Sequence, residues 1–259
     1  MYHNINEKCS IIVSSCDAYS DVWPVFFTLF FRYWPDCPFP VYLVAENKVY
    51  PDKRVKTIIV GKDKSWATNT KKAVRHIVTP YILNLFEDFL FTQKINTEEI
   101  ANLLELTKKE NAACLKLDPR PWPDKKFKNY KEIGEVSKNV NYSVSLLSGF
   151  WDKKIFESLL KDGETAWQME IDGSKRAINI MEPFLSTYER PLHCFYSTAI
   201  KKGKWFYDAV LFCEREGIAI DKQSRSIETK KDYYLRNISH LPAIGRPFSF
   251  LMRQLKKII

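Results

Sequence analysis

The chain has 259 residues, of which 45% are hydrophobic and 14% aromatic, enough for one large α/β domain or for a domain with an appendage. Its longest apolar stretch, residues 22–34, is interrupted by Arg32 and is too short to span a bilayer. The first residues are polar and lack the apolar region of a signal peptide, so we expect a cytoplasmic location. Six scattered cysteines without a CxxC pair and four histidines without ligand spacing disfavour zinc sites and disulfides.

The net charge of +9 is concentrated near the C-terminus. Residues 201–259 hold thirteen Lys or Arg against six Asp or Glu, and no acid follows Tyr233. A basic segment of this kind suggests a nucleic acid, an anionic membrane surface or an anionic substrate as partner.

Strand-like and helix-like segments alternate along the chain, which predicts an α/β fold with a largely parallel sheet. The expected strands are residues 9–15, 41–45, 55–60, 81–86, 112–117 and 142–147. The expected helices are residues 22–33, 64–77, 97–110, 152–160 and 165–171. Ser20 or Asp21 is expected to cap the first helix, and the Pro-rich residues 118–135 are expected to form a long loop.

The run from residue 79 to residue 91 is apolar except where Glu87 and Asp88 interrupt it. A buried parallel strand has this pattern, and open α/β sheets bind ligands at the carboxyl ends of their strands. Two buried acids there would need a cation or hydrogen-bond donors to compensate them. Alternatively, Glu87 and Asp88 simply begin a solvated loop.

Several nucleotide-binding and hydrolytic classes are disfavoured by missing motifs. The chain has only eight glycines and neither GxGxxG nor GxxxxGK[ST], which a Rossmann dehydrogenase or a P-loop enzyme would use to bind phosphates. It also lacks the GxSxG motif of α/β-hydrolases.

The order of the remaining motifs resembles a known family. Residues 14–17 (Ser-Ser-Cys-Asp), 66–69 (Trp-Ala-Thr-Asn) and 81–88 (Tyr-Ile-Leu-Asn-Leu-Phe-Glu-Asp) resemble the nucleotide-sugar half of GT-A fold glycosyltransferases. They are most similar to the bacterial family-2-like enzymes of capsule, O-antigen and lipooligosaccharide biosynthesis. Residues 145–151 and 167–170 are similar to the acceptor half, so the resemblance covers roughly residues 9–175.

The resemblance implies roles for the two acids after the fourth strand. Asp88, assisted by Glu87, would bind the donor diphosphate and a divalent cation, Mn²⁺ or Mg²⁺. Phe89 departs from the family pattern, because many relatives carry the last acid of the DxD-type motif there. Either Asp88 alone holds the cation together with phosphates and water, or basic side chains neutralise the leaving diphosphate.

Other positions follow from the same resemblance. Asp17 and Asn69 would contact the donor, although Asp17 equally suits a turn and Asn69 a polar helix position. Glu170 would be the catalytic base of an inverting transfer, with Glu164 and Asp172 as competing carboxylates. Ser148, Gly149 and Trp167 would contact the acceptor, although Trp167 equally suits a core position.

These assignments predict a glycosyltransferase domain at residues 1–190, followed by a basic segment at residues 191–259. The expected donor is a UDP-sugar, and the expected acceptor a glycan or lipid-linked glycan. Residues 248–259 mix apolar and basic side chains, which suits either an anionic bilayer on the cytosolic face of the inner membrane or packing against the chain's own domain. No nucleic-acid partner is expected, but a nucleic-acid-binding protein and a non-catalytic interaction subunit remain the competing hypotheses.

Overall fold

The computed structural model describes residues 5–194 and 198–239. The chain divides into two compact units, Met1–Tyr196 and Ser197–Ile259, which are described separately.

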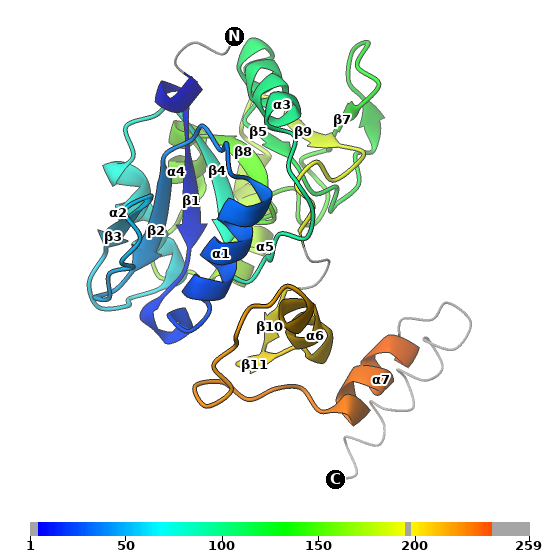
Figure 1. Cartoon of the computed structure of the whole chain (residues 1–259). Coiled ribbons are helices and arrows are strands. Elements are labelled where there is room, and N and C mark those ends of the chain that lie inside the picture. Colours follow the sequence, from blue (N-terminus) through cyan, green and yellow to red (C-terminus); the bar gives the residue numbers. More distant parts are fainter. Residues whose placement is uncertain (1–4, 195–197, 240–259) are drawn as a thin grey trace, which may run out of the picture. The chain divides into compact units, whose positions relative to one another are not determined.

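The first unit is built on a nine-stranded sheet (Figure 1). The strand order is β3-β2-β1-β4-β8-β5-β9-β7-β6. The strands are β1 (Cys9–Ser14), β2 (Val41–Ala45), β3 (Val55–Ile59), β4 (Tyr81–Phe86), β5 (Cys114–Lys116), β6 (Lys125–Lys126), β7 (Ile133–Glu135), β8 (Gly149–Asp152) and β9 (Phe184–Thr187).

Most of these strands run in one direction. The β1 to β4 strands are mutually parallel, and β5 pairs in parallel with β9, whereas β8 is antiparallel to both β4 and β5. The carboxyl ends of β1, β4 and β5 therefore lie at one edge of the sheet, where β8 begins. The expected mixed, mostly parallel sheet flanked by helices is confirmed.

Helices cover both faces of this sheet. The α2 (Trp66–His76), α4 (Lys153–Leu159) and α5 (Ala166–Ala177) helices contact one another and pack on one face. The α1 (Trp23–Tyr33) and α3 (Thr97–Lys109) helices cover the other face (Figure 1). Two 3₁₀ turns, Ile5–Glu7 and Asp17–Tyr19, flank β1.

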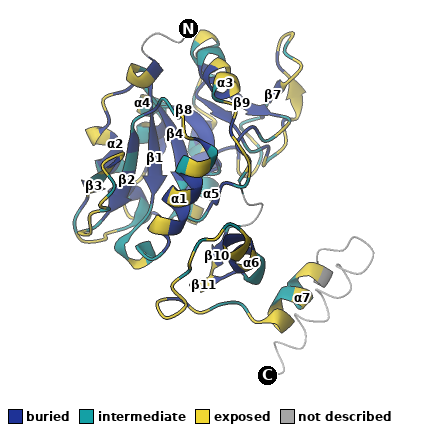
Figure 2. Cartoon of the chain, in the orientation of Figure 1, coloured by how far each residue is buried: buried dark blue, intermediate teal, exposed yellow. Residues whose placement is uncertain are grey.

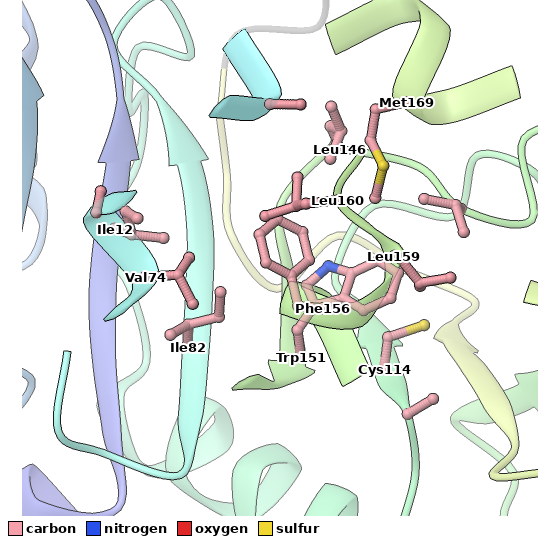
Figure 3. Packing of buried hydrophobic residues seen from close by; sticks show 14 of the residues in the cluster. Ile12, Val74, Ile82, Cys114, Leu146, Trp151, Phe156, Leu159, Leu160 and Met169 are labelled. Atoms are coloured by element: carbon pink, nitrogen blue, oxygen red, sulfur yellow. The ribbon is translucent and has the colours of Figure 1, made fainter. Parts of the chain in front are cut away.

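The central strands are buried on both sides (Figure 2), which explains their nearly continuous apolar sequences. On the α2–α4–α5 face, Trp151 of β8 and Phe156 of α4 fill the middle of the core, with their ring centroids 5.3 Å apart (Figure 3). Leu146 and Met169 close the same cluster.

Three local expectations are wrong. Residues 142–147 form no strand, because the backbone N–H groups of Val144 and Leu146 bond side chains of α5 instead of a neighbouring strand. The α1 helix starts after Val22 without a side-chain cap, and Ser20 accepts a hydrogen bond from Lys48. The expected long loop contains the β6–β7 hairpin.

The second unit, as far as residues 198–239 describe it, has a short β10–β11 hairpin (Ile200–Lys201, Lys204–Trp205) and two helices, α6 (Tyr207–Arg215) and α7 (Lys230–Ser239). Arg236 of α7 binds Asp208 and Glu228 at 3.0 Å each. The amphipathic prediction for residues 248–259 lies outside the described residues. No helix within the described ranges is both long and apolar enough to cross a bilayer.

Replacing Gly149 by Ala should destabilise the first unit. A Cβ atom there would lie 3.2 Å from the Leu115 carbonyl oxygen and 3.2 Å from Lys116 Cα, which are backbone atoms of the neighbouring strand. We expect chemical denaturation to show a loss of about 1–3 kcal/mol in the free energy of unfolding.

The matched control is Gly173→Ala in α5. Its Cβ would meet the flexible Met169 side chain at 3.0 Å, and alanine favours the helix. An equal loss in both variants would show that the approach of β8 to β5 is not the cause.

Candidate functional site

A pocket of about 260 Å³ opens at the carboxyl ends of β1 and β4. The two strands end together, because Ser14 and Phe86 are register partners. Its lining combines hydroxyl groups, aromatic rings and carboxylates, and comprises Ser14, Ser15, Cys16, Tyr19, Asp63, Trp66, Phe86, Glu87 and Asp88. The sheet therefore presents a pocket with carboxylates in its lining at the edge where the sequence predicted a site.

Glu87 and Asp88 both line this pocket, in the turn that follows β4. Glu87 is buried and Asp88 is half-buried, so neither acid is a fully solvated strand end. Phe89 is buried as well and packs edge-on against Phe86 with a centroid distance of 5.7 Å. Phe89 is thus part of the hydrophobic packing in this chain.

Asp63 and Trp66 are pocket residues that the sequence analysis did not assign. Trp66 stacks on Phe86, with centroids 6.4 Å apart and planes 24° apart, so the pocket has a flat aromatic wall. Asn69, one turn further along α2, is buried and donates a hydrogen bond of 2.9 Å to Asp63 Oδ1. Asn69 therefore reaches the pocket through Asp63, and does not line it directly.

Asp17 is engaged elsewhere and is not among the residues lining the pocket. Its carboxylate accepts hydrogen bonds from the backbone N–H groups of Glu46, Asn47 and Lys48 and so fixes the loop after β2. Burial opposes ionisation, but these three N–H groups outweigh it and lower the pKa of Asp17. The structure thus gives Asp17 a loop-anchoring role, and its predicted donor contact stays a prediction.

The residues of the pocket fit a divalent cation only in part. Asp63, Glu87 and Asp88 supply the oxygen ligands that Mg²⁺ and Mn²⁺ prefer. Within the described part of the chain, however, no three acidic, His or Cys side chains are grouped closely enough to hold a metal by themselves. A cation here would complete its coordination with diphosphate oxygens and water.

A second, smaller hollow is lined in part by Phe89. Its lining includes Ser148, Asp118 and two arginines, Arg120 and Arg190. Arg120 binds Asp118 through two parallel hydrogen bonds of 2.7 Å each, and Arg190 binds the same carboxylate at 3.1 Å. One carboxylate thus holds two guanidinium groups, which leaves this hollow positively charged. Asp118 and Arg120 belong to residues 118–135, which the sequence predicts to be a long loop.

Glu170 of α5 lies close enough to Arg120 for their charges to interact. The α5 helix begins with a capping box formed by Thr165 and Gln168, which fixes where Glu170 falls on the helix. Glu170 Oε1 accepts a hydrogen bond of 2.9 Å from the Leu146 N–H. Burial raises the pKa of Glu170, while the Leu146 N–H, Lys116 and Arg120 act in the opposite direction.

The two competing carboxylates, Glu164 before α5 and Asp172 on it, are already engaged. Glu164 is buried and is bound by both terminal nitrogens of Arg176 at 2.7 Å each. Asp172 is partly exposed and pairs with Lys175 at 2.6 Å. Glu170 is therefore the carboxylate of α5 with the raised pKa expected of a general base.

The predicted acceptor residues lie around the same segment. Ser148 is buried, and its carbonyl oxygen accepts a hydrogen bond from the Leu117 N–H, which holds it beside β5. Gly149 begins β8, where it pairs with both Asn84 and Lys116. Trp167 is 62% exposed, three residues before Glu170 and on the same side of α5, so it is not a core residue.

Two buried polar residues behind the site were missed by the sequence analysis. Asn84, in the middle of β4, donates a hydrogen bond of 2.7 Å to the Leu146 carbonyl oxygen. Lys116, at the end of β5, is 1% exposed and donates one of 3.2 Å to the Tyr142 carbonyl oxygen. A polar residue inside an apolar strand was the available signal in both cases.

Comparison with known proteins finds likenesses only among solved structures. No family model matches the chain, and no curated protein matches it. The mannosyltransferase PcManGT from Pyrobaculum calidifontis, solved in complex with GDP-Man and Mn²⁺, is 11% identical with a TM-score of 0.49, and the match covers 76% of this chain and 58% of that one.

Two structures of TarS from S. aureus, residues 1–349, are also similar. One is 13% identical with a TM-score of 0.49, and the other, in complex with UDP-GlcNAc, is 12% identical with a TM-score of 0.46. Each match covers 92% of this chain and 74% of the TarS chain. Likenesses of this size do not establish a shared activity.

Removing the amide of Asn84 should weaken the fold around Leu146. In Asn84→Ala the Leu146 carbonyl oxygen loses its donor, and an unsatisfied buried acceptor costs about 1–3 kcal/mol. Urea denaturation measures this loss. Asn179→Ala, at an exposed position, serves as the control and should leave the midpoint unchanged.

Lys116 should make stability depend on pH. Burial is the main cause that lowers its pKa from 10.5 to about 8, so between these values the unfolded chain binds a proton that the folded chain does not. Stability should therefore rise with pH across this window, by up to about 3 kcal/mol relative to Lys116→Met. If the free energy of unfolding depends on pH in the same way in wild type and in Lys116→Met, this expectation is contradicted.

Proposed function

We propose that the protein is a glycosyltransferase that moves a sugar from a nucleotide-sugar donor to a hydroxyl group of an acceptor. The observation that carries this proposal is the division of charge across the 86–89 turn. Three carboxylates line the first pocket, whereas Arg120 and Arg190 share the single carboxylate of Asp118 in the second hollow, and the charge of Arg120 also acts on the half-buried Glu170. Such an arrangement suits a donor that binds through a cation at the carboxylates. It also suits an acceptor that lies beside a general base.

The first pocket suits the nucleotide end of the donor. The Trp66 and Phe86 rings offer a flat surface on which a base can stack. Among the described lining residues there are three carboxylates and no Lys or Arg, so a diphosphate there needs a cation to offset the repulsion. We therefore favour a divalent cation over basic side chains, with Asp88 as its main protein ligand and Glu87 assisting.

The chemistry we assign is a single displacement. The acceptor oxygen attacks the anomeric carbon while the bond from that carbon to the diphosphate breaks, and Glu170 takes the proton of the acceptor hydroxyl. The bonding electrons leave with the diphosphate, whose developing charge a bound cation stabilises. Attack opposite the leaving group inverts the anomeric centre, and Trp167 offers an exposed ring on which a sugar can stack.

The donor and acceptor classes are part of the same proposal. We assign a UDP-sugar as donor and a glycan or lipid-linked glycan of a surface polysaccharide as acceptor. The net charge of +9 and the basic residues 233–259 support association with an anionic membrane surface that carries such an acceptor. The domain limits, residues 1–190 and 191–259, stay a prediction.

The test is hydrolysis of a panel of nucleotide sugars by wild type, Asp88→Asn and Glu170→Gln, with Mn²⁺ or with EDTA. Hydrolysis of the donor should require the cation, and the Asp88→Asn variant should lose this hydrolytic activity. Glu170→Gln keeps an oxygen for the Leu146 N–H but cannot accept a proton, so we expect a loss of roughly 10²–10⁴-fold. Wild-type activity should fall as the pH drops through the raised pKa of Glu170, above its ordinary 4.5.

Asp172→Asn is the matched control, because Asp172 lies two residues further along the same helix and pairs with Lys175. It should retain wild-type rates. If no nucleotide sugar binds to the wild type even at millimolar concentration, the transferase proposal fails. Salt-sensitive binding to DNA or RNA in its place would favour the nucleic-acid hypothesis.

A further inference from the structure

Lys116 is a buried lysine near the site. It is 1% exposed at the end of β5, and the carboxylate whose charge acts on it is that of Glu170. Its Nζ atom donates to the Tyr142 carbonyl oxygen at 3.2 Å. Burying an ammonium group costs free energy, and the proposed transfer assigns Lys116 no contact with either substrate.

Lys116 and Glu170 hold the same short loop from its two ends. Lys116 binds the carbonyl of Tyr142, whereas Glu170 binds the N–H of Leu146 four residues later. Between them, Ser174 accepts a hydrogen bond of 3.0 Å from the Val144 N–H. The position of the Glu170 carboxylate is therefore tied, through this loop, to the position of Lys116.

The charged and titratable groups that act on Glu170 are Lys116 from β5 and Arg120 from the loop after β5, together with the Ser145 hydroxyl. Arg120 is 48% exposed in its side chain and already shares the Asp118 carboxylate. The charge of Arg120 is thus offset by Asp118 and screened by water, whereas that of Lys116 is neither. Cys114, also on β5, is the other titratable group that acts on Lys116.

We propose, resting on the function proposed above, that Lys116 is a positioning residue for Glu170: its buried ammonium group seats the 142–147 loop and supplies the charge that keeps the Glu170 carboxylate ionised. Lys116 touches neither substrate in this proposal and acts only through Glu170. Its loss should therefore change the ionisation of the base and the acidic limb of the pH profile.

The experiment follows Glu170 by ¹³C NMR in uniformly labelled glutamate, with Glu170→Gln to assign its carboxyl signal. In wild type, the signal should show a second inflection near pH 8, where Lys116 loses its proton. In Lys116→Met and in Lys116→Gln, the main midpoint should rise by about one pH unit or more, because an opposite charge has been removed. Lys116→Gln keeps a donor for Tyr142 and so separates the charge from the hydrogen bond.

The rate of donor hydrolysis by the same variants is measured as a function of pH. The acidic limb of this pH–rate profile should shift to higher pH by the same amount as the Glu170 midpoint. Lys116→Arg keeps the charge and should restore the wild-type limb. Lys138→Met is the matched control, since Lys138 also donates to backbone carbonyl groups, those of Ile180 and Met181, but does not act on Glu170.

A lowered melting temperature with an unchanged Glu170 midpoint would reduce Lys116 to a structural residue and overturn the proposal. The wild-type inflection near pH 8 needs no variant to fold, so its absence overturns the proposal as well. A wild type that hydrolyses no nucleotide sugar would overturn the proposed function. If the wild type hydrolyses a nucleotide sugar but the Glu170 signal does not respond to Lys116, only the proposed role of Lys116 is overturned.

Discussion

The arrangement of the site depends on the backbone of Leu146, whose N–H and carbonyl groups are held from opposite sides. Asn84 of β4 binds its carbonyl oxygen at 2.7 Å and Glu170 of α5 binds its N–H at 2.9 Å. The strand that ends in Glu87 and Asp88 is thereby connected to the helix that carries the proposed base. Because Asn84 is fully buried, the connection lies where water does not compete for these hydrogen bonds.

The strand that follows the 142–147 loop, β8, separates two parts of the site that differ in charge. Residues 142–147 form a loop beside α5 and are followed by β8, which runs against its neighbours β4 and β5. The insertion of β8 separates the β4 end, with its carboxylates, from the β5 end, with Lys116, Asp118 and Arg120. Opposite charges can therefore be kept on one sheet edge, each near a different part of the reaction we propose.

Burial shapes the chemistry of each ionisable group here. It raises the pKa of Glu170 and lowers that of Lys116, and each is partly restored by attraction to the other. Asp17 shows the opposite outcome, because three backbone N–H groups outweigh burial and lower its pKa. A carboxylate that is satisfied by backbone donors anchors a loop, whereas one kept partly unsatisfied is available to accept a proton.

The sequence by itself determined the elements and the edge at which to look. The apolar run predicted a strand at residues 81–86, where β4 lies, and placed Glu87 and Asp88 at its end. Only the tertiary structure decided that residues 142–147 are a loop, since their alternation imitates a strand and side chains of α5 take their N–H groups. Asp63 likewise became a pocket residue only through contacts between segments far apart in the chain, which no local pattern encodes.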